Sequence, residues 1–145
     1  MTYNRPARII FVEDNPAHIE LAKRALEAEG FCNKVEFFST APAVIEYLDS
    51  NFPPDIIFID RILSNSTLQG DDIANFLMAD KMFSETEICM MSSSYVDREK
   101  ENEYAASKIK FFLKKPLITE QLEAVIKSSK RLRKLIVVVD SKEAA

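Results

Sequence analysis

PDIIFIDR, Pro54 to Arg61, is the stretch of this sequence that decides the fold. Its four consecutive apolar residues, Ile56 to Ile59, predict a strand that is buried on both faces, as in a parallel sheet covered by helices. Asp60 follows this strand directly. A carboxylate in that position loses its hydration, so its charge requires a compensating partner. Asp60 is therefore the first candidate for a functional residue.

Apolar runs alternate with helix-like spacing along the rest of the chain. Strands are expected at residues 8–12, 34–38, 55–59, 87–91 and 108–113. Apolar residues three and four positions apart predict a helix after the first, second, third and fifth strands, the last one reaching Leu132. A charged helix is expected around residues 97–107, after the fourth strand. Asn15 and Pro16 are typical of a helix start, and Gly30 is typical of a helix end. Each helix is then a crossover, which predicts an α/β, doubly wound, five-stranded parallel sheet with five helices.

Composition limits the class of protein. A chain of 145 residues with 47% hydrophobic residues suits one domain with a sizeable core. No apolar run approaches the roughly 20 residues that span a bilayer, and the N-terminus lacks the apolar stretch of a secretory signal. We therefore expect a cytoplasmic protein with no membrane partner. Only two glycines occur, which excludes glycine-rich phosphate-binding loops.

Charge is unevenly distributed along the chain. The net charge is −4, but residues 108–134 carry nine Lys/Arg and only two Asp/Glu. This basic segment is either a solvated helix face or a docking surface for an acidic partner. Nucleic acid is not expected as a partner, because residues 1–107 carry 19 Asp/Glu against nine Lys/Arg and would repel it.

Polar side chains follow four of the expected strands at their carboxyl ends, where open parallel sheets bind ligands. They are Glu13 and Asp14, Asp60, Ser92, and Lys115. Clustered carboxylates repel one another, and a hard divalent cation such as Mg²⁺ or Mn²⁺ offsets that repulsion. The lysine and the hydroxyl would bind phosphoryl oxygens, so Asp60 is a candidate nucleophile that accepts a phosphoryl group. Each residue alone could be a helix cap or a loop end; their joint placement favours the site.

With these residues in place, the sequence resembles the receiver domain of bacterial two-component response regulators. The motifs that carry the resemblance are IIFVEDNP, DIIFID, ICMMSS and FFLKKP. They lie within residues 7–132, so we expect a receiver domain at 1–132 and a C-terminal extension at 133–145. The resemblance implies a flavodoxin-like (CheY-like) fold. It is strongest with the small regulators that partner bacterial phytochrome kinases.

The resemblance also implies a role for each matching residue. Asp60 would be the phosphoacceptor. The metal ligands would be Glu13, Asp14, Asp60 and the backbone carbonyl of Ile62. The loop from Asp60 to Gly70 is about two residues longer than the family pattern, which leaves the presentation of that carbonyl open.

The remaining implied roles concern the phosphoryl group and the switch. Lys115 would contact the phosphoryl group, and the Lys115–Pro116 bond would be cis. Ser92 would be drawn toward the phosphoryl group, and Phe112 would move into the space that it vacates. Phe112 lacks the hydroxyl that a tyrosine would supply at this position.

These roles predict a stand-alone response regulator. A histidine kinase or a phosphotransfer protein would donate to Asp60, and a downstream protein target would bind the surface around the fourth and fifth helices. No enzymatic activity is expected beyond Mg²⁺-dependent self-phosphorylation and autodephosphorylation. The alternative is an interaction module that keeps the receiver fold and works without phosphorylation.

His18 is the only histidine in the chain. A phosphodonor histidine would define a phosphotransfer protein, but those proteins are helical bundles, whereas this chain alternates strands and helices. His18 also falls on the apolar stripe of its expected helix. We therefore interpret it as a structural residue.

The tail LIVVVD, Leu135 to Asp140, follows the last expected helix. Helix continuation fits the spacing of its apolar residues, but four consecutive β-branched residues favour a strand. An added strand needs a partner edge, either in this subunit or in the same segment of a second one. We predict the second arrangement, a homodimer through the tail.

Overall fold

The computed structural model describes residues 3–28, 35–64, 66–92, 98–107, 109–129 and 135–136. Its strands are β1 (Tyr3–Pro6), β2 (Ile9–Val12), β3 (Val35–Phe38), β4 (Ile56–Asp60), β5 (Glu87–Ser92), β6 (Ile109–Lys114) and β7 (Leu135–Ile136). Its helices are α1 (Pro16–Ala28), α2 (Ala41–Ser50), α3 (Gly70–Met78), α4 (Arg98–Ala106) and α5 (Thr119–Ser128), with a short 3-10 helix η1 (Lys81–Phe83).

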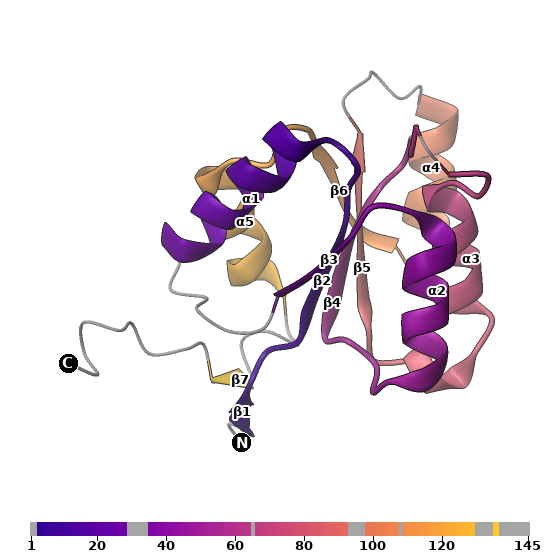
Figure 1. The fold of residues 1–145 in the computed structure, drawn as a ribbon, viewed down its shortest axis with the longest axis horizontal. Helices are drawn as coiled ribbons and strands as arrows, with labels where there is room; N and C mark the ends of the chain where they lie inside the picture. Colours follow the sequence, from indigo (N-terminus) through magenta and orange to yellow (C-terminus); the bar gives the residue numbers. More distant parts are fainter. Residues whose placement is uncertain are drawn as a thin grey trace.

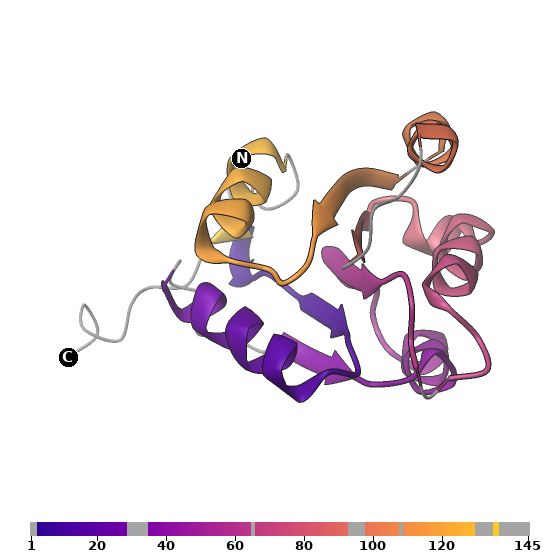
Figure 2. The ribbon, with the colours of Figure 1, turned by 90° about the horizontal axis from the view of Figure 1, so that it is seen from above.

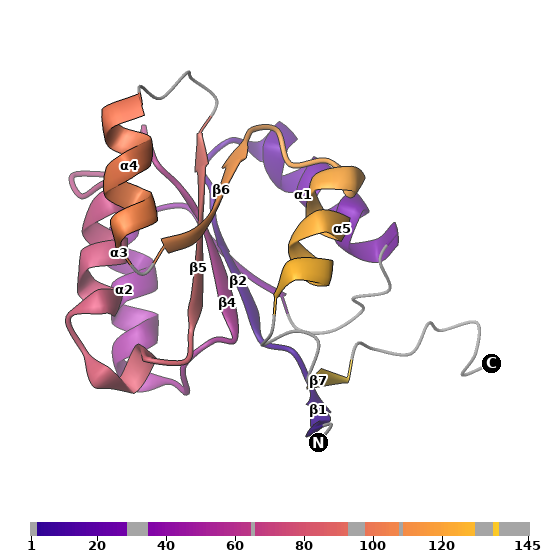
Figure 3. The same ribbon diagram turned by 180° about the vertical axis from the view of Figure 1, so that it is seen from behind.

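The main sheet has the predicted parallel architecture. Its strand order is β3-β2-β4-β5-β6, and every pair of neighbours is parallel. Helices α1 and α5 cover one face, and α2, α3 and α4 cover the other (Figures 1 and 2). The reverse view shows the same two layers of helices around the central strands (Figure 3). None of the helices in the described part of the chain has the length and apolar character needed to cross a membrane.

Alternation along the strands divides the core into two halves. In β4, Ile56 and Phe58 face α1 and α5, whereas Ile57 and Ile59 face the three helices on the other side. All four side chains are fully buried. Burial on both faces of the strand therefore explains the uninterrupted apolar run, as predicted.

The start of helix α1 agrees with the sequence signal, whereas the end of α5 does not. Asn15 caps α1, since its Oδ1 accepts hydrogen bonds from the N–H groups of Ala17 at 2.9 Å and His18 at 3.4 Å. The predicted helix end at Gly30 lies outside the described residues. Helix α5 ends at Ser128, and Ser129 is extended, so the helix is shorter than predicted. Leu132 also lies outside the described residues.

The C-terminal strand is confirmed at its first two residues, but its partner differs from the predicted one. Strand β7 pairs in parallel with β1 of the same chain, in a separate two-stranded sheet. Figure 1 places this pair beyond the amino-terminal end of β2, away from the carboxyl edge of the main sheet. The sequence did not predict a strand at Tyr3–Pro6, and this strand provides the edge with which the tail pairs. Residues 137–140 lie outside the described part.

Gly70 allows helix α3 to begin against the end of β4. A Cβ atom at this position would lie 2.3 Å from the carbonyl oxygen of Asp60 and 2.8 Å from the Cα of Arg61. Both atoms belong to the backbone, which cannot move aside without displacing the strand. The Gly70 N–H also donates a hydrogen bond to the carbonyl of Arg61 at 3.1 Å. The absence of a side chain here thus sets the path of the backbone beside Asp60.

The close approach at Gly70 predicts the sign of a substitution. Alanine is the better helix former, by about 1 kcal/mol. Gly70→Ala is nevertheless expected to lower the free energy of unfolding by about 1–3 kcal/mol, because the added methyl group overpacks against backbone. Equilibrium urea unfolding measures the difference. A variant as stable as the wild type would contradict the close approach.

Candidate functional site

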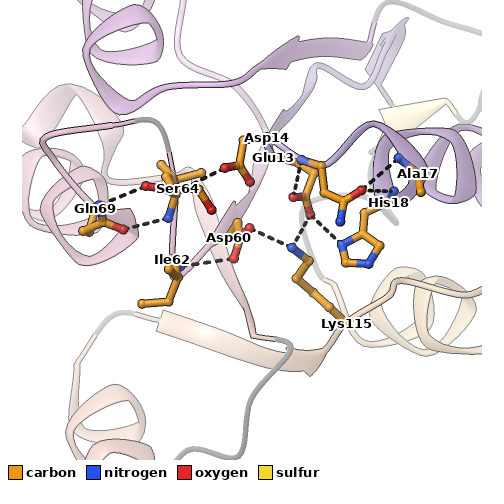
Figure 4. Close-up of polar contacts among 11 residues, drawn as sticks. Glu13, Asp14, Ala17, His18, Asp60, Ile62, Ser64, Gln69 and Lys115 are labelled. Carbon is orange, nitrogen blue, oxygen red and sulfur yellow. Dashed lines mark hydrogen bonds and ion pairs between the residues drawn. The ribbon is translucent and has the colours of Figure 1, made fainter.

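Hydrogen bonds between neighbouring strands fix the backbone of the candidate residues. The N–H groups that follow β2, β4 and β6 each donate to a carbonyl at the end of an adjacent strand, at 2.8 Å in every case: Glu13 to Phe38, Arg61 to Met91, and Lys115 to Ser92. The ladder of the sheet thus extends one residue past these strand ends. The side chains of Glu13, Asp60 and Lys115 start from fixed positions along one edge and converge (Figure 4).

The ammonium of Lys115 lies between two buried carboxylates. Its Nζ is 2.6 Å from Oε1 of Glu13 and 2.7 Å from Oδ2 of Asp60. All three side chains are no more than 5% exposed. Lys115 therefore compensates the charge of Asp60 at the end of its buried strand.

Asp14 completes a group of three carboxylates. One oxygen from each of Glu13, Asp14 and Asp60 lies within 4.8 Å of the others. Backbone N–H groups orient two of these carboxylates: Asp14 Oδ2 accepts from Ser64 at 2.7 Å, and Asp60 Oδ1 accepts from Ile62 at 3.1 Å. Carboxylate oxygens at this spacing form the kind of donor set that binds a hard divalent cation.

A cavity of about 360 Å³ opens over these groups. It is lined by Asp14, Asn15, His18, Asp60, Ile62, Ser64 and Lys115. Six of these seven residues are polar, and both signs of charge are present. A small charged group would match this lining better than an apolar ligand would.

Burial and neighbouring charges shift the pKa values of Glu13 and Lys115. Burial raises the pKa of the Glu13 carboxyl above its usual value, although the hydrogen bond from Lys115 acts in the opposite direction. Burial disfavours the ammonium of Lys115, but its hydrogen bonds to Asp60 and Glu13 outweigh this effect and raise the lysine pKa. Lys115 is consequently a permanent positive charge at neutral pH.

His18 lies at the site, and not on the buried face of α1. Residues Ala22, Ala25 and Leu26 form that face. The imidazole lines the cavity, and its Nδ1 is 3.7 Å from Oε1 of Glu13. Burial, followed by the positive charge of Lys115, lowers the histidine pKa, so the ring is neutral at neutral pH. Within the described part of the chain, this buried Nδ1 has no hydrogen-bond partner.

Neither of the two predicted switch residues is among the described residues that line the cavity. Ser92 is buried at the end of β5, in register with Lys114 of β6. Phe112 is half-buried on the face covered by α2, α3 and α4, and its ring centroid is 5.4 Å from that of Tyr104 in α4. Ile62 is near the carboxylates, where its N–H contacts Asp60 and its half-exposed side chain lines the cavity. The Lys115–Pro116 bond is cis, as the resemblance implied.

Three residues at or near the site were not among the predicted functional residues: His18, Ser64 and Gln69. Ser64 and Gln69 belong to the loop after Asp60, which has no apolar periodicity from which to predict its conformation. One signal for Gln69 was available, because Asp72 follows three positions later, as in a helix-capping box. The Gln69 N–H does donate to Oδ2 of Asp72, at 2.8 Å.

The fold and the strand-end site together define a class of protein, the flavodoxin-like receivers. Residues 9–127 match the response regulator receiver domain family, and the chain belongs to that family. A curated relative, the probable methanogenesis regulatory protein FilR2 of Methanothrix harundinacea, is 25% identical over 130 residues, covering 86% of this chain and 82% of the relative.

Solved structures support the fold. The bacteriophytochrome response regulator AtBRR has a TM-score of 0.74 at 21% identity, covering 93% of this chain and 98% of that chain. The bacteriophytochrome response regulator RtBRR has a TM-score of 0.76 at 20% identity, covering 93% of this chain and 82% of that chain. A CheY-like receiver domain protein of Methanospirillum hungatei has a TM-score of 0.68 at 22% identity, covering 86% of this chain and 93% of that chain. The predicted likeness to regulators that partner phytochrome kinases is thus matched at the level of the fold.

Removing the Lys115 ammonium is expected to make stability depend on pH. Lys115→Met leaves Glu13 and Asp60 facing each other, which should cost about 3–5 kcal/mol at neutral pH. It also removes the cation that opposes the raised pKa of Glu13, so this pKa rises further. A carboxyl whose pKa is higher in the folded than in the unfolded state favours folding at low pH and loses that contribution as the pH rises through its folded pKa.

Urea unfolding without metal ions, at pH 5 and pH 7.5, measures this effect. Lys115→Met should be closer to the wild type at pH 5 than at pH 7.5. The matched control is Lys127→Met, which removes an exposed ion pair with Glu123 and should change stability by less than about 1 kcal/mol at both pH values. An equal loss at both pH values for Lys115→Met would contradict the role of the ammonium.

Proposed function

We propose that this receiver domain accepts a phosphoryl group on Asp60 from a phosphohistidine of a histidine kinase or of a phosphotransfer protein. The contact that carries the proposal is the Lys115 ammonium, 2.7 Å from Asp60 and 2.6 Å from Glu13. This contact places a positive charge beside the Asp60 carboxylate, and both groups line the polar cavity. These are the requirements of a nucleophile that attacks a phosphoryl group.

The transfer exchanges one bond to phosphorus for another. A carboxylate oxygen of Asp60 attacks the phosphorus atom and forms a P–O bond, which gives an acyl phosphate. The P–N bond of the donor breaks, and its electron pair returns to the imidazole, which takes up a proton. The Lys115 ammonium, already at Asp60, would stabilise the charge on the phosphoryl oxygens.

The three carboxylates fit a divalent cation. Their oxygens lie within 4.8 Å of one another and form an all-oxygen donor set that suits Mg²⁺ or Mn²⁺. Glu13, Asp14 and Asp60 would bind the ion, with the Ile62 carbonyl as a further ligand. When bound, the ion supplies positive charge that offsets the charge of the transferred group.

The receiver domain in this proposal extends over residues 1–132, with residues 133–145 as a C-terminal extension.

Phe112 and Tyr104 provide a route from the site to the output surface. Ser92 would move toward the phosphoryl group, and Phe112 would follow into the vacated space. The Phe112 ring packs against Tyr104, whose hydroxyl donates to Oδ1 of Asp71 in α3 at 2.6 Å. Burial, together with this contact to Asp71, raises the pKa of the Tyr104 hydroxyl, so it remains a donor. A shift of Phe112 would therefore disturb the contact between α4 and α3.

A downstream protein target would bind the surface around α4 and α5, and the protein would act in the cytoplasm. The tail-mediated dimer is not part of the proposal, because β7 pairs with β1 of its own chain. The alternative is an interaction module that works without phosphorylation. Beryllofluoride with Mg²⁺ distinguishes the two, because this analogue of the acyl phosphate should alter the α4 surface only if the site is functional.

Asp60 is expected to be the single acceptor. Wild type incubated with acetyl phosphate and Mg²⁺ should gain one phosphoryl group by intact mass, and Asp60→Asn should gain none. Asp49→Asn, an exposed carboxylate in α2, is the matched control and should be labelled like the wild type. Equal labelling of Asp60→Asn would overturn the assignment.

Mg²⁺ is expected to stabilise the fold, because it relieves repulsion among the three carboxylates. Binding to the folded state alone adds about 2.7 kcal/mol at one hundred times the dissociation constant. Thermal melts should therefore rise with Mg²⁺ in the wild type and in Asp49→Asn, and much less in Asp14→Asn. A wild-type melting temperature that is constant across millimolar Mg²⁺ would argue against the metal site.

A further inference from the structure

The loop between Asp60 and helix α3 leaves the sheet and returns to nearly the same point. At its start the Arg61 N–H donates to the carbonyl of Met91 at 2.8 Å, and at its end the Gly70 N–H donates to the carbonyl of Arg61 at 3.1 Å. These contacts fix the ends of the loop. They leave open what determines the conformation of the residues between them, which include Ile62 and Ser64 at the cavity.

Within the described part of this loop, residues 61–64 and 66–69, one side chain makes three hydrogen bonds to the backbone. The amide oxygen of Gln69 accepts from the N–H of Leu63 at 2.7 Å. Its amide nitrogen donates to the carbonyls of Leu63 at 3.1 Å and Ser66 at 2.9 Å. The amide therefore satisfies both backbone groups of Leu63, as a neighbouring strand would, in a segment that has no strand beside it.

Leu63 stands between the two residues that contact the carboxylates. On one side, the Ile62 N–H donates to Asp60, and on the other the Ser64 N–H donates to Asp14. The side chain of Leu63 is 1% exposed and packs in the core with α2 and α3. The Leu63 N–H shares a planar peptide unit with the Ile62 carbonyl, and the Leu63 carbonyl shares one with the Ser64 N–H. Fixing both groups of Leu63 thus orients the Ile62 carbonyl and the Ser64 N–H, and through the Ser64 N–H the carboxylate of Asp14.

We propose that Gln69 is a positioning residue for the metal site, an inference that rests on the proposed function. Its amide clamps Leu63, so that Ser64 holds the Asp14 carboxylate ready for the cation and Ile62 presents its carbonyl. Groups that orient metal ligands from behind typically change metal affinity by about 10- to 100-fold when they are removed. Gln69 thus supports the metal ligands from behind, from the loop between Asp60 and helix α3.

Gln69 also precedes helix α3, and a capping role is the competing explanation. In that role its N–H donates to Oδ2 of Asp72 at 2.8 Å, a contact that does not involve the Gln69 side chain. Asp72→Ala removes this cap and leaves the three side-chain bonds intact. Gln69→Met keeps the length of the side chain and removes all three bonds. The pair of variants therefore separates the clamp from the cap.

Two measurements test the clamp in the full chain. Calorimetric titration with Mg²⁺ should give about 10- to 100-fold weaker binding for Gln69→Met and wild-type binding for Asp72→Ala. Without metal, amide hydrogen exchange followed by NMR should be faster at Leu63 and Ser64 in Gln69→Met than in the wild type and Asp72→Ala. The second readout reports the loop itself and is independent of phosphorylation.

The outcomes are distinct. Gln69→Met that binds Mg²⁺ as the wild type does, or that weakens binding no more than Asp72→Ala, overturns the inference and leaves the proposed function intact. Unchanged exchange at Leu63 and Ser64 in Gln69→Met also overturns it. A wild type that shows no binding of Mg²⁺ overturns the metal site of the proposed function, and the role of Gln69 with it.

Discussion

The whole site depends on one ammonium group between two carboxylates that the sheet has removed from water. Desolvation costs several kcal/mol for each buried ion, and attraction to Lys115 compensates for this only because its Nζ lies within 2.7 Å of both Glu13 and Asp60. Buried ion pairs of this kind are often no more stabilising than apolar residues of similar volume. Stability therefore does not explain the arrangement, whereas the proposed role of Asp60 as a nucleophile at the wall of a polar cavity does.

Periodicity along the chain was enough to predict the main sheet and most of the charged site. The apolar run before Asp60 predicted a strand covered on both faces, and parallel pairing then brought Glu13, Asp14, Asp60 and Lys115 to one edge. That step needs no knowledge of the side-chain conformations, because the ends of parallel strands meet wherever the sheet forms. The roles of these residues in catalysis and metal binding are still predictions, as are those of Ser92, Phe112 and Ile62.

The features that escaped prediction depend on contacts that have no period in the sequence. The pairing of β1 with β7 joins the two ends of the described chain, and two short segments so far apart carry no local signal of each other. His18 has the spacing of a buried helix position, but it lies near the start of α1, where the helix meets the cavity. Gln69 acts through side-chain bonds to a loop backbone, which only three-dimensional geometry reveals.

The site thus has two halves that differ in how they are fixed. The backbone of Glu13 and Lys115 is hydrogen-bonded to the adjacent strands, and Asp60 is itself the last residue of β4, so these three can move little without disrupting the sheet. The orientation of the Asp14 carboxylate instead depends on the N–H of Ser64. Ser64 lies in the loop whose backbone is hydrogen-bonded to the Gln69 side chain. Local opening requires the least free energy where few backbone bonds must break. A change of charge at Asp60 would therefore be accommodated first in the loop and at Asp14, while Glu13, Asp60 and Lys115 keep the geometry on which the proposed phosphoryl transfer depends.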